Sequence, residues 1–336
     1  MRLVTALLIV IAACWASYTY SEHHKGKNPF ETLYMHLVPA ALVHHGDDHG
    51  AADDHDSAAE HDSEADGGHH AAAEPLLKVP IPGFLAFMDY RGEMGANIPE
   101  GEGPMTVLFN LQIFQIAAVL LILVLFSGVP AYVRTGQGDK ISGVFAGWAM
   151  WIRDEVVYPQ MGKELGRKFL PYFLCVFFFI LFMNVMGLVP FSATATASWW
   201  VTMALALTTL LSMIVCGMVM QGPVQFWLNL VPHVPVLLWP LLFIVELVGL
   251  FVKPFALMVR LCANMSGGHM VVLSFMGLIF FFSGAWGSGG GWGSTPVAVG
   301  FAVFIMVIEI FVAMMQAYIF TQLSVIFVNA SVHPEH

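Results

Sequence analysis

Residues 236–283 read VLLWPLLFIVELVGLFVKPFALMVRLCANMSGGHMVVLSFMGLIFFFS, a run of 48 residues that is apolar almost throughout. As one helix this run would be about 70 Å long, whereas about 20 helical residues already cross the hydrocarbon core of a membrane. A single upright helix therefore cannot contain it. Two arrangements remain open: a tight hairpin that turns near residues 260–268, where protein must cover the exposed backbone, or a steeply tilted or bent helix that packs against a large partner.

Four other apolar runs are long enough to enter a membrane. Residues 297–328 form a second over-long run of 32 residues, which suggests that two adjacent helices share one tilt. The other three runs have the length of one ordinary crossing and cover residues 105–126, 169–190 and 199–220. The sequence therefore predicts an all-α polytopic membrane protein with five membrane helices, of which the last two are long and tilted.

The segment between the first two crossings, residues 127–168, predicts the orientation of the chain. It carries six Lys and Arg residues, and short loops rich in these residues stay in the cytoplasm. Within it, residues 141–157 mix Trp, Phe and Val with charges, as a helix lying in the membrane interface does. We therefore expect one interfacial helix, a bacterial inner-membrane location and a cytoplasmic C-terminus.

Composition excludes several classes of protein. The 336 residues are 58% hydrophobic and 11% charged, against about 25% charged residues in ordinary soluble domains, so a water-soluble enzyme is ruled out. The net charge of −10 comes from residues 44–74, which hold ten acidic and no basic residues, while the rest of the chain is neutral. Binding of nucleic acid is not expected, because no strongly basic surface is present.

The N-terminus has the pattern of an export signal. Arg2 precedes an apolar run, residues 3–13. This run is too short to span a membrane, because a helix needs about 20 residues to cross it. We therefore predict a signal peptide at residues 1–16 and a periplasmic mature N-terminus. Cleavage at a lipoprotein box ending in Cys14, cleavage by an ordinary signal peptidase and an uncleaved anchor all remain open.

A periplasmic region, residues 17–104, is predicted to precede the membrane domain, residues 105–336. Its segment 44–74 holds seven of the fourteen histidines among the acidic residues, a composition typical of a disordered tail. Metal capture or proton buffering is the alternative for this segment. The four Cys residues lack the spacing of a metal site, and we expect neither a metal nor a cofactor.

A few polar side chains interrupt the last two apolar runs. Glu246, Lys253 and Arg260 recur every seven residues and so share one helix face, with Asn264 four residues further on. His269 follows Arg260 by nine residues, which places it on the opposite face of an ideal helix. In the last run, Glu309 and Gln316 are again seven residues apart.

The chemistry of these side chains points to proton movement. Burying a lone arginine costs several kcal/mol and arginine cannot deprotonate, so Arg260 must meet an anion. Glu309 and His269 together form a titrating pair of the kind found in proton relays. Glu246 fits either an aqueous exit or a snorkelling side chain, and Lys253 fits snorkelling better. The amide side chains of Asn264 and Gln316 fit either a proton path or hydrogen bonds between helices.

Residues 253–269, KPFALMVRLCANMSGGH, resemble the hallmark stretch of the a subunit of the rotary ATP synthase, the static proton-channel subunit of its membrane sector. Residues 183–190 with the following Thr-rich turn, and residues 309–320, are similar to two other patterns of that family. The resemblance covers residue 105 to the C-terminus and, less closely, residues 28–38. Many bacterial members carry Glu at the position of His269 and His at that of Glu309, so the pair is exchanged here, as in mitochondrial members.

The resemblance implies both an architecture and a mechanism. The two long helices would curve around a ring of c subunits, and Arg260 would be the essential charge facing the ring carboxylate. Partners would be the c-subunit ring, the b subunits of the peripheral stalk, the remainder of the ATP synthase complex and the lipid bilayer, and the subunit would form no covalent bonds itself. The proton path would comprise Glu309, His269, Asn264, Gln316 and Glu246.

A secondary ion or metal transporter with a His-rich periplasmic segment is the alternative. It would account for charges inside membrane helices. Such a protein should also show repeat symmetry or paired acidic and histidine ligands within its helices, and the sequence shows neither.

Overall fold

The computed structural model describes residues 2–20, 78–80, 105–107, 110–136, 138–189, 194–230 and 238–332. Five helical segments in this part of the chain are long and apolar enough to cross a membrane: Arg2–Tyr20, Asn110–Thr135, Lys140–Gly187, Trp199–Gln221 and Trp239–Val332. The predicted all-α polytopic membrane fold is confirmed. The His-rich segment 44–74 and most of the predicted periplasmic region 17–104 lie outside the described residues.

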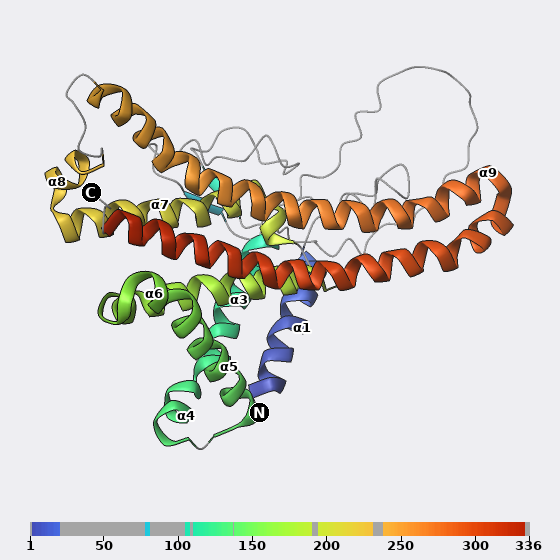
Figure 1. Cartoon of the computed structure of the whole chain (residues 1–336). Coiled ribbons are helices and arrows are strands. Elements are labelled where there is room, and N and C mark those ends of the chain that lie inside the picture. The colour runs from blue at the N-terminus through green and yellow to red at the C-terminus, as the bar shows by residue number, and fades with distance from the viewer. Residues whose placement is uncertain are drawn as a thin grey trace.

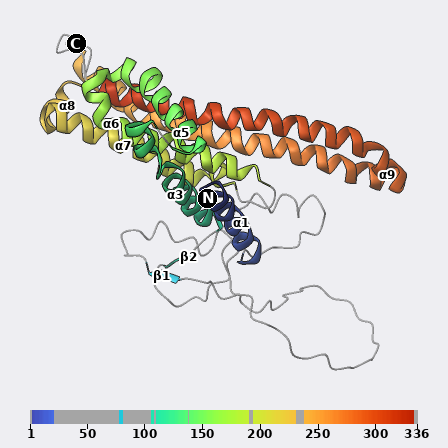
Figure 2. The same cartoon turned by 90° about the horizontal axis from the view of Figure 1, so that it is seen from below.

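Helix α9, Trp239–Val332, contains both over-long apolar runs and folds into a hairpin of two arms (Figure 1). We call residues 239–285 the first arm and residues 288–332 the second arm. The chain reverses where Trp286 and Gly287 leave helical geometry, and the φ of 72° at Gly287 is one that glycine adopts without strain. The arms also lie side by side when the molecule is seen from below (Figure 2). The first arm is helical through residues 260–268, as in the long-helix arrangement.

Helices α6 (Tyr158–Gly187) and α7 (Trp199–Gln221) form a second hairpin that packs against α9 (Figure 1). The turn between them contains the short helix η3, Ala195–Ala197. Large apolar side chains of α6 and of both arms of α9 fill the interface, which stabilises the association of the helices by close packing. The largest of these, each at most 1% exposed, include Phe173, Ile180, Leu257, Leu261 and Phe320.

The chain reaches α6 through α3 (Asn110–Phe126), α4 (Val129–Thr135), α5 (Lys140–Trp151) and the π-helical η2 (Ile152–Val157). The predicted interfacial helix, residues 141–157, corresponds to α5 and η2. These continue directly into α6, which bends at Gly162, where φ is 72°. The predicted crossing 105–126 becomes helical at Asn110. Before it, strand β2 (Met105–Val107) pairs antiparallel with β1 (Lys78–Pro80).

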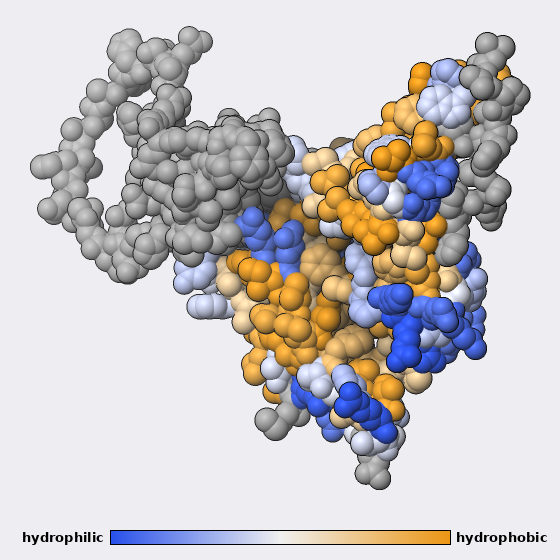
Figure 3. All heavy atoms as spheres, turned by 90° about the vertical axis from the view of Figure 1, so that its left-hand side faces the viewer, coloured by the Kyte–Doolittle hydropathy of each residue, from blue (hydrophilic) through white to orange (hydrophobic). Residues whose placement is uncertain are grey.

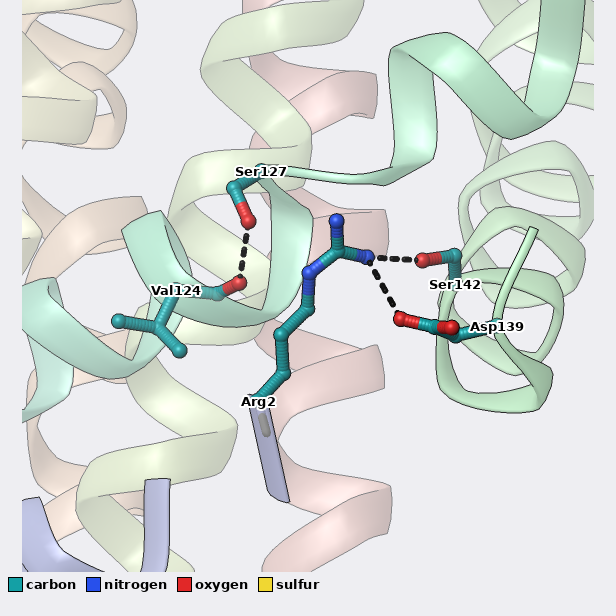
Figure 4. Close-up of polar contacts among 5 residues, drawn as sticks. All are labelled: Arg2, Val124, Ser127, Asp139 and Ser142. Atoms are coloured by element: carbon teal, nitrogen blue, oxygen red, sulfur yellow. Dashed lines mark hydrogen bonds and ion pairs between the residues drawn. The ribbon is translucent and has the colours of Figure 1, made fainter. Parts of the chain in front are cut away.

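Helix α1, Arg2–Tyr20, packs along α3 and includes the predicted signal peptide. Its Arg2 guanidinium donates to Ser142 Oγ at 2.5 Å and lies 3.6 Å from a carboxylate oxygen of Asp139, at the start of α5 (Figure 4). The N-terminal end of α1 is therefore joined to the segment for which a cytoplasmic location is predicted. Cleavage of residues 1–16 stays a prediction.

On the face shown in Figure 3, much of the surface of the described helices is apolar and hydrophilic residues gather in separate patches. In α9, only 22% of the most apolar 18-residue stretch is buried inside this chain. Exposed apolar faces of this extent mark contact with lipid or with another protein. Helix α9 therefore needs a cover that the described residues do not supply. After α7, the short helix α8 (Pro223–Leu228) begins the return toward α9.

Candidate functional site

Arg260 lies on the exposed side of the first arm of α9. It makes no hydrogen bond or ion pair with any residue that the structure describes. Exposed apolar side chains occur on both arms of α9, since Phe255 on the first arm is 58% exposed and Phe311 on the second arm is 65% exposed. A permanent charge on an apolar membrane surface is stable only opposite an anion or water. Arg260 therefore faces outward and needs a group from outside the described chain.

His269 and Glu309 face one another between the two arms of α9. Nδ1 of His269 lies 3.4 Å from Oε1 of Glu309. Both side chains are largely enclosed, at 14% and 3% exposure, and neither Glu309 oxygen has a hydrogen-bond partner among the described residues. Burying an ionised carboxylate without hydrogen bonds costs free energy. The side chains of Glu309 and His269 can therefore share a proton and exchange it.

A second polar pair bridges the arms. Nδ2 of Asn264 donates to Oε1 of Gln316 at 2.9 Å, and Gln316 is 2% exposed. Between Glu309 and Gln316, the carbonyl of Ala313 accepts a hydrogen bond from Asn184 of α6 at 3.2 Å. Glu309 and Gln316 thus lie on the side of the second arm that faces the first arm. Arg260 takes part in neither of these two pairs.

The turn between α6 and α7 completes the surroundings of His269. Oγ1 of Thr194 lies 2.7 Å from Nε2 of His269. Gly268 permits the approach from the other direction, because a Cβ there would lie 2.5 Å from Oε1 and 2.7 Å from Cδ of Glu309. The imidazole is therefore enclosed by a hydroxyl on one nitrogen and a carboxyl on the other.

The remaining predicted residues stand apart from this pair. Glu246 is half-buried on the first arm and has no hydrogen bond or ion pair within the described residues. Lys253 is also half-buried, and its Nζ lies 5.9 Å from the centre of the Phe327 ring in a cation–π contact. Snorkelling of this side chain stays a prediction.

Sequence reasoning passed over Asn184 and Thr194. Both are buried polar residues, at 0% and 4% exposure. Their position in the sequence could have indicated a role in the site. Asn184 lies inside the family-like stretch 183–190, and Thr194 lies in the Thr-rich turn that follows it. Their proximity to the titrating pair depends on how the two hairpins pack together, and no spacing in the sequence states that.

Comparison with known proteins identifies the family. Residues 112–329 match the family described as ATP synthase A chain. ATP synthase subunit a of Myxococcus xanthus (strain DK1622) is 38% identical over 273 residues, which are 80% of this chain and 87% of that protein. The subunits a of Anaeromyxobacter dehalogenans (strain 2CP-C) and Chloroherpeton thalassium are 39% and 38% identical, over 72% and 71% of this chain and 62% and 71% of their own lengths. The resemblance carried by residues 253–269 is thus confirmed, and the chain belongs to the ATP synthase subunit a family.

Proposed function

We propose that this chain carries protons to and from the carboxylates of a c-subunit ring through two half channels, and so couples proton flow to rotation and ATP synthesis. The observation that carries this proposal is the position of Arg260, exposed on an apolar membrane face without a partner in the described chain. A ring carboxylate is the anion that this charge would meet. The exposed apolar face of α9 would be covered by the ring and by lipid.

The electrostatics of a ring carboxylate explain why rotation needs two channels. A protonated carboxyl group can face lipid, whereas an ionised one cannot, because its desolvation is too costly. The ring then turns only when protons enter and leave through water-accessible paths. A proton motive force of about 150 mV supplies about 3.5 kcal/mol per charge for this movement, at about 2.3 kcal/mol per 100 mV.

Arg260 would keep the two half channels apart. Its charge favours ionisation of the ring carboxylate that passes it, so the proton leaves on the side of Glu246. The same charge repels a proton that would otherwise cross directly from one path to the other. Arginine suits this role because it stays charged in a low-dielectric site.

Glu309 and His269 would deliver the next proton from the periplasmic side, together with Asn264 and Gln316. The distance of 3.4 Å between the carboxyl and the imidazole supports a direct exchange after a small side-chain rotation. The amide pair supports a hydrogen-bonded bridge between the arms beside that pair, because Asn264, exposed on the first arm, donates to the buried Gln316 at 2.9 Å. All four residues lie on α9, so the spacing of its arms sets the path.

The composition of the complex tests this function. Tagged chain purified from its native membrane in mild detergent is expected to bring with it the c ring, the b subunits and an ATPase head. In inverted vesicles the same complex should form a pH gradient when ATP is added. Recovery of the chain alone, with metal transport in reconstituted vesicles, would contradict the proposal and favour the secondary-transporter alternative.

Gly268 offers a test of the packing around the titrating pair. Gly268→Ala is expected to slow ATP-driven proton pumping roughly tenfold, because its Cβ would displace the enclosed Glu309 carboxyl, and such overpacking costs about 1–3 kcal/mol. Gly267→Ala is the matched control, since nothing lies within 4 Å of the Cβ that it adds. Equal pumping rates in the two assembled variants would argue against a close approach of Glu309 to the first arm.

A further inference from the structure

The turn between α6 and α7 brings a hydroxyl to His269 that the proposed proton path does not use. Oγ1 of Thr194 lies 2.7 Å from Nε2 of the imidazole. The same oxygen donates to the carbonyl of Gly187 at 3.3 Å. Since Thr194 is only 4% exposed, these contacts are protected from bulk water. Thr194 thus connects the end of α6 to the side of His269 that points away from Glu309.

Contacts with α9 hold this turn in place. The backbone carbonyl of Ala197 accepts hydrogen bonds from Cys262 Sγ at 3.1 Å and from Ser266 Oγ at 3.3 Å. Cys262, Ser266 and His269 are spaced four and three residues apart, so they lie on one face of the first arm. The face that anchors the turn is therefore also the face that carries the imidazole.

Gly187 makes the close approach of Thr194 possible. A Cβ on Gly187 would lie 2.9 Å from Cγ2 and 3.3 Å from Cα of Thr194. Gly187 is also the last residue of α6, so its carbonyl belongs to the final turn, whose acceptors lack a partner within the helix. The end of α6 thus offers both the space and the acceptor that Thr194 uses.

The number of protons on Thr194 and His269 determines which group donates in each of these hydrogen bonds. The hydroxyl of Thr194 has one proton and the carbonyl of Gly187 can only accept. Both contacts are satisfied when Oγ1 donates to Gly187 and accepts from Nε2–H of His269. A neutral imidazole has a single N–H, so Nδ1 then carries a free lone pair. Nδ1 is the atom that lies 3.4 Å from Oε1 of Glu309.

We propose that Thr194 is a positioning residue of the proton path, whose hydroxyl holds His269 in the Nε2–H tautomer so that Nδ1 receives the proton of Glu309. In this step the O–H bond of Glu309 breaks and an N–H bond forms on Nδ1, leaving a carboxylate beside an imidazolium. The Nε2–H of the imidazolium stays bonded to Thr194. The reverse step returns the proton, so the device serves synthesis and pumping alike.

Activity in inverted vesicles gives the first test, which rests on the proton path proposed above. Thr194→Val keeps the shape but removes the hydroxyl, and ATP-driven pumping is expected to fall roughly tenfold, the effect of losing one hydrogen bond to an ionised group. Thr194→Ser should restore pumping to within about twofold. If the valine variant does not retain the c ring, Thr194→Ala provides a second hydroxyl-free chain.

Thr202→Val is the matched control. Thr202 is buried, but among the described residues its hydroxyl bonds only to the carbonyls of Ser198 and Trp199, at 3.0 and 3.1 Å, at the start of its own helix. Pumping by this variant should stay at the wild-type rate. Undiminished pumping by assembled Thr194→Val, or an equal loss in the Thr202 control, would overturn the inference.

The tautomer itself can be measured in the assembled complex by ¹⁵N spectroscopy of labelled histidine. The signal of His269 is identified by its loss in His269→Gln, and we expect a protonated Nε2 and an unprotonated Nδ1 in the wild type. Thr194→Val should give a mixture of tautomers. A wild-type imidazole protonated on Nδ1 would refute the role of Thr194. Normal pumping by His269→Gln would instead refute the proposed relay, so the two failures are distinguishable.

Discussion

Proton-driven ATP synthesis is expected to disappear in Arg260→Ala, while passive proton conduction through the membrane sector persists or increases. The substitution removes two effects together: the counter-charge of the ring carboxylate and the barrier between the half channels. The helix itself should survive, because alanine is the best helix former and Arg260 makes no hydrogen bond or ion pair within the described chain. The measurements are ATP synthesis and ATP-driven gradient formation in inverted vesicles, with the c ring retained on purification.

Arg260→Lys distinguishes the effect of the positive charge from that of the guanidinium group itself. Lysine keeps a positive charge at neutral pH, but it can deprotonate in a low-dielectric site and lacks the planar fork of five donors. We therefore expect coupled synthesis to fail in this variant as well. The control is Lys253→Ala, seven residues earlier on the first arm, which should retain coupling to within about twofold. Near-normal coupling in assembled Arg260→Ala would overturn the assignment of Arg260 as the essential charge.

The membrane helices can be predicted from the sequence, because a long apolar run is a strong signal of a helix. The sequence does not show where two successive helices join without a break. Residues 141–157 and 169–190 were predicted as separate helices, one interfacial and one spanning. In the structure, α5, η2 and α6 form one bent helical path from Lys140 to Gly187. Charge patterns indicate how deep a segment lies in the membrane, and they do not state where the backbone bends. The bend at Gly162 depends on its positive φ of 72°.

The polar residues of the site were predictable as candidates, because each interrupts an apolar run at a cost. Their pairing depends on where the chain reverses. In an antiparallel hairpin, facing residues lie at similar distances from the turn, and the pairs His269–Glu309, Asn264–Gln316 and Phe275–Phe301 are all centred near residues 288–290. The glycine-rich segment 284–295 between the two apolar runs is typical of a loop, but its backbone is mostly helical and only Trp286 and Gly287 depart from helical geometry. A one-turn error in the reversal would have misaligned every pair.

Glu309→Gln is expected to slow ATP synthesis and ATP-driven pumping together, each by about a hundredfold or more, the usual contribution of a positioned acid or base. Glutamine fills the same space between the arms but cannot release or accept a proton at its side-chain oxygen. Because Glu309 is enclosed by the first arm and lies 3.4 Å from Nδ1 of His269, bulk water has little access to replace it. The measurements are initial rates in both directions from the same vesicles.

The double exchange Glu309→His with His269→Glu tests whether the two side chains act as one pair. It restores one carboxyl and one imidazole across the same gap, so it should recover part of the activity that each single substitution loses. Recovery is expected to be incomplete, because Oγ1 of Thr194 would then face a carboxylate in place of Nε2 of His269. Strictly additive losses in the double variant, with the c ring retained, would show that Glu309 and His269 do not exchange a proton with one another.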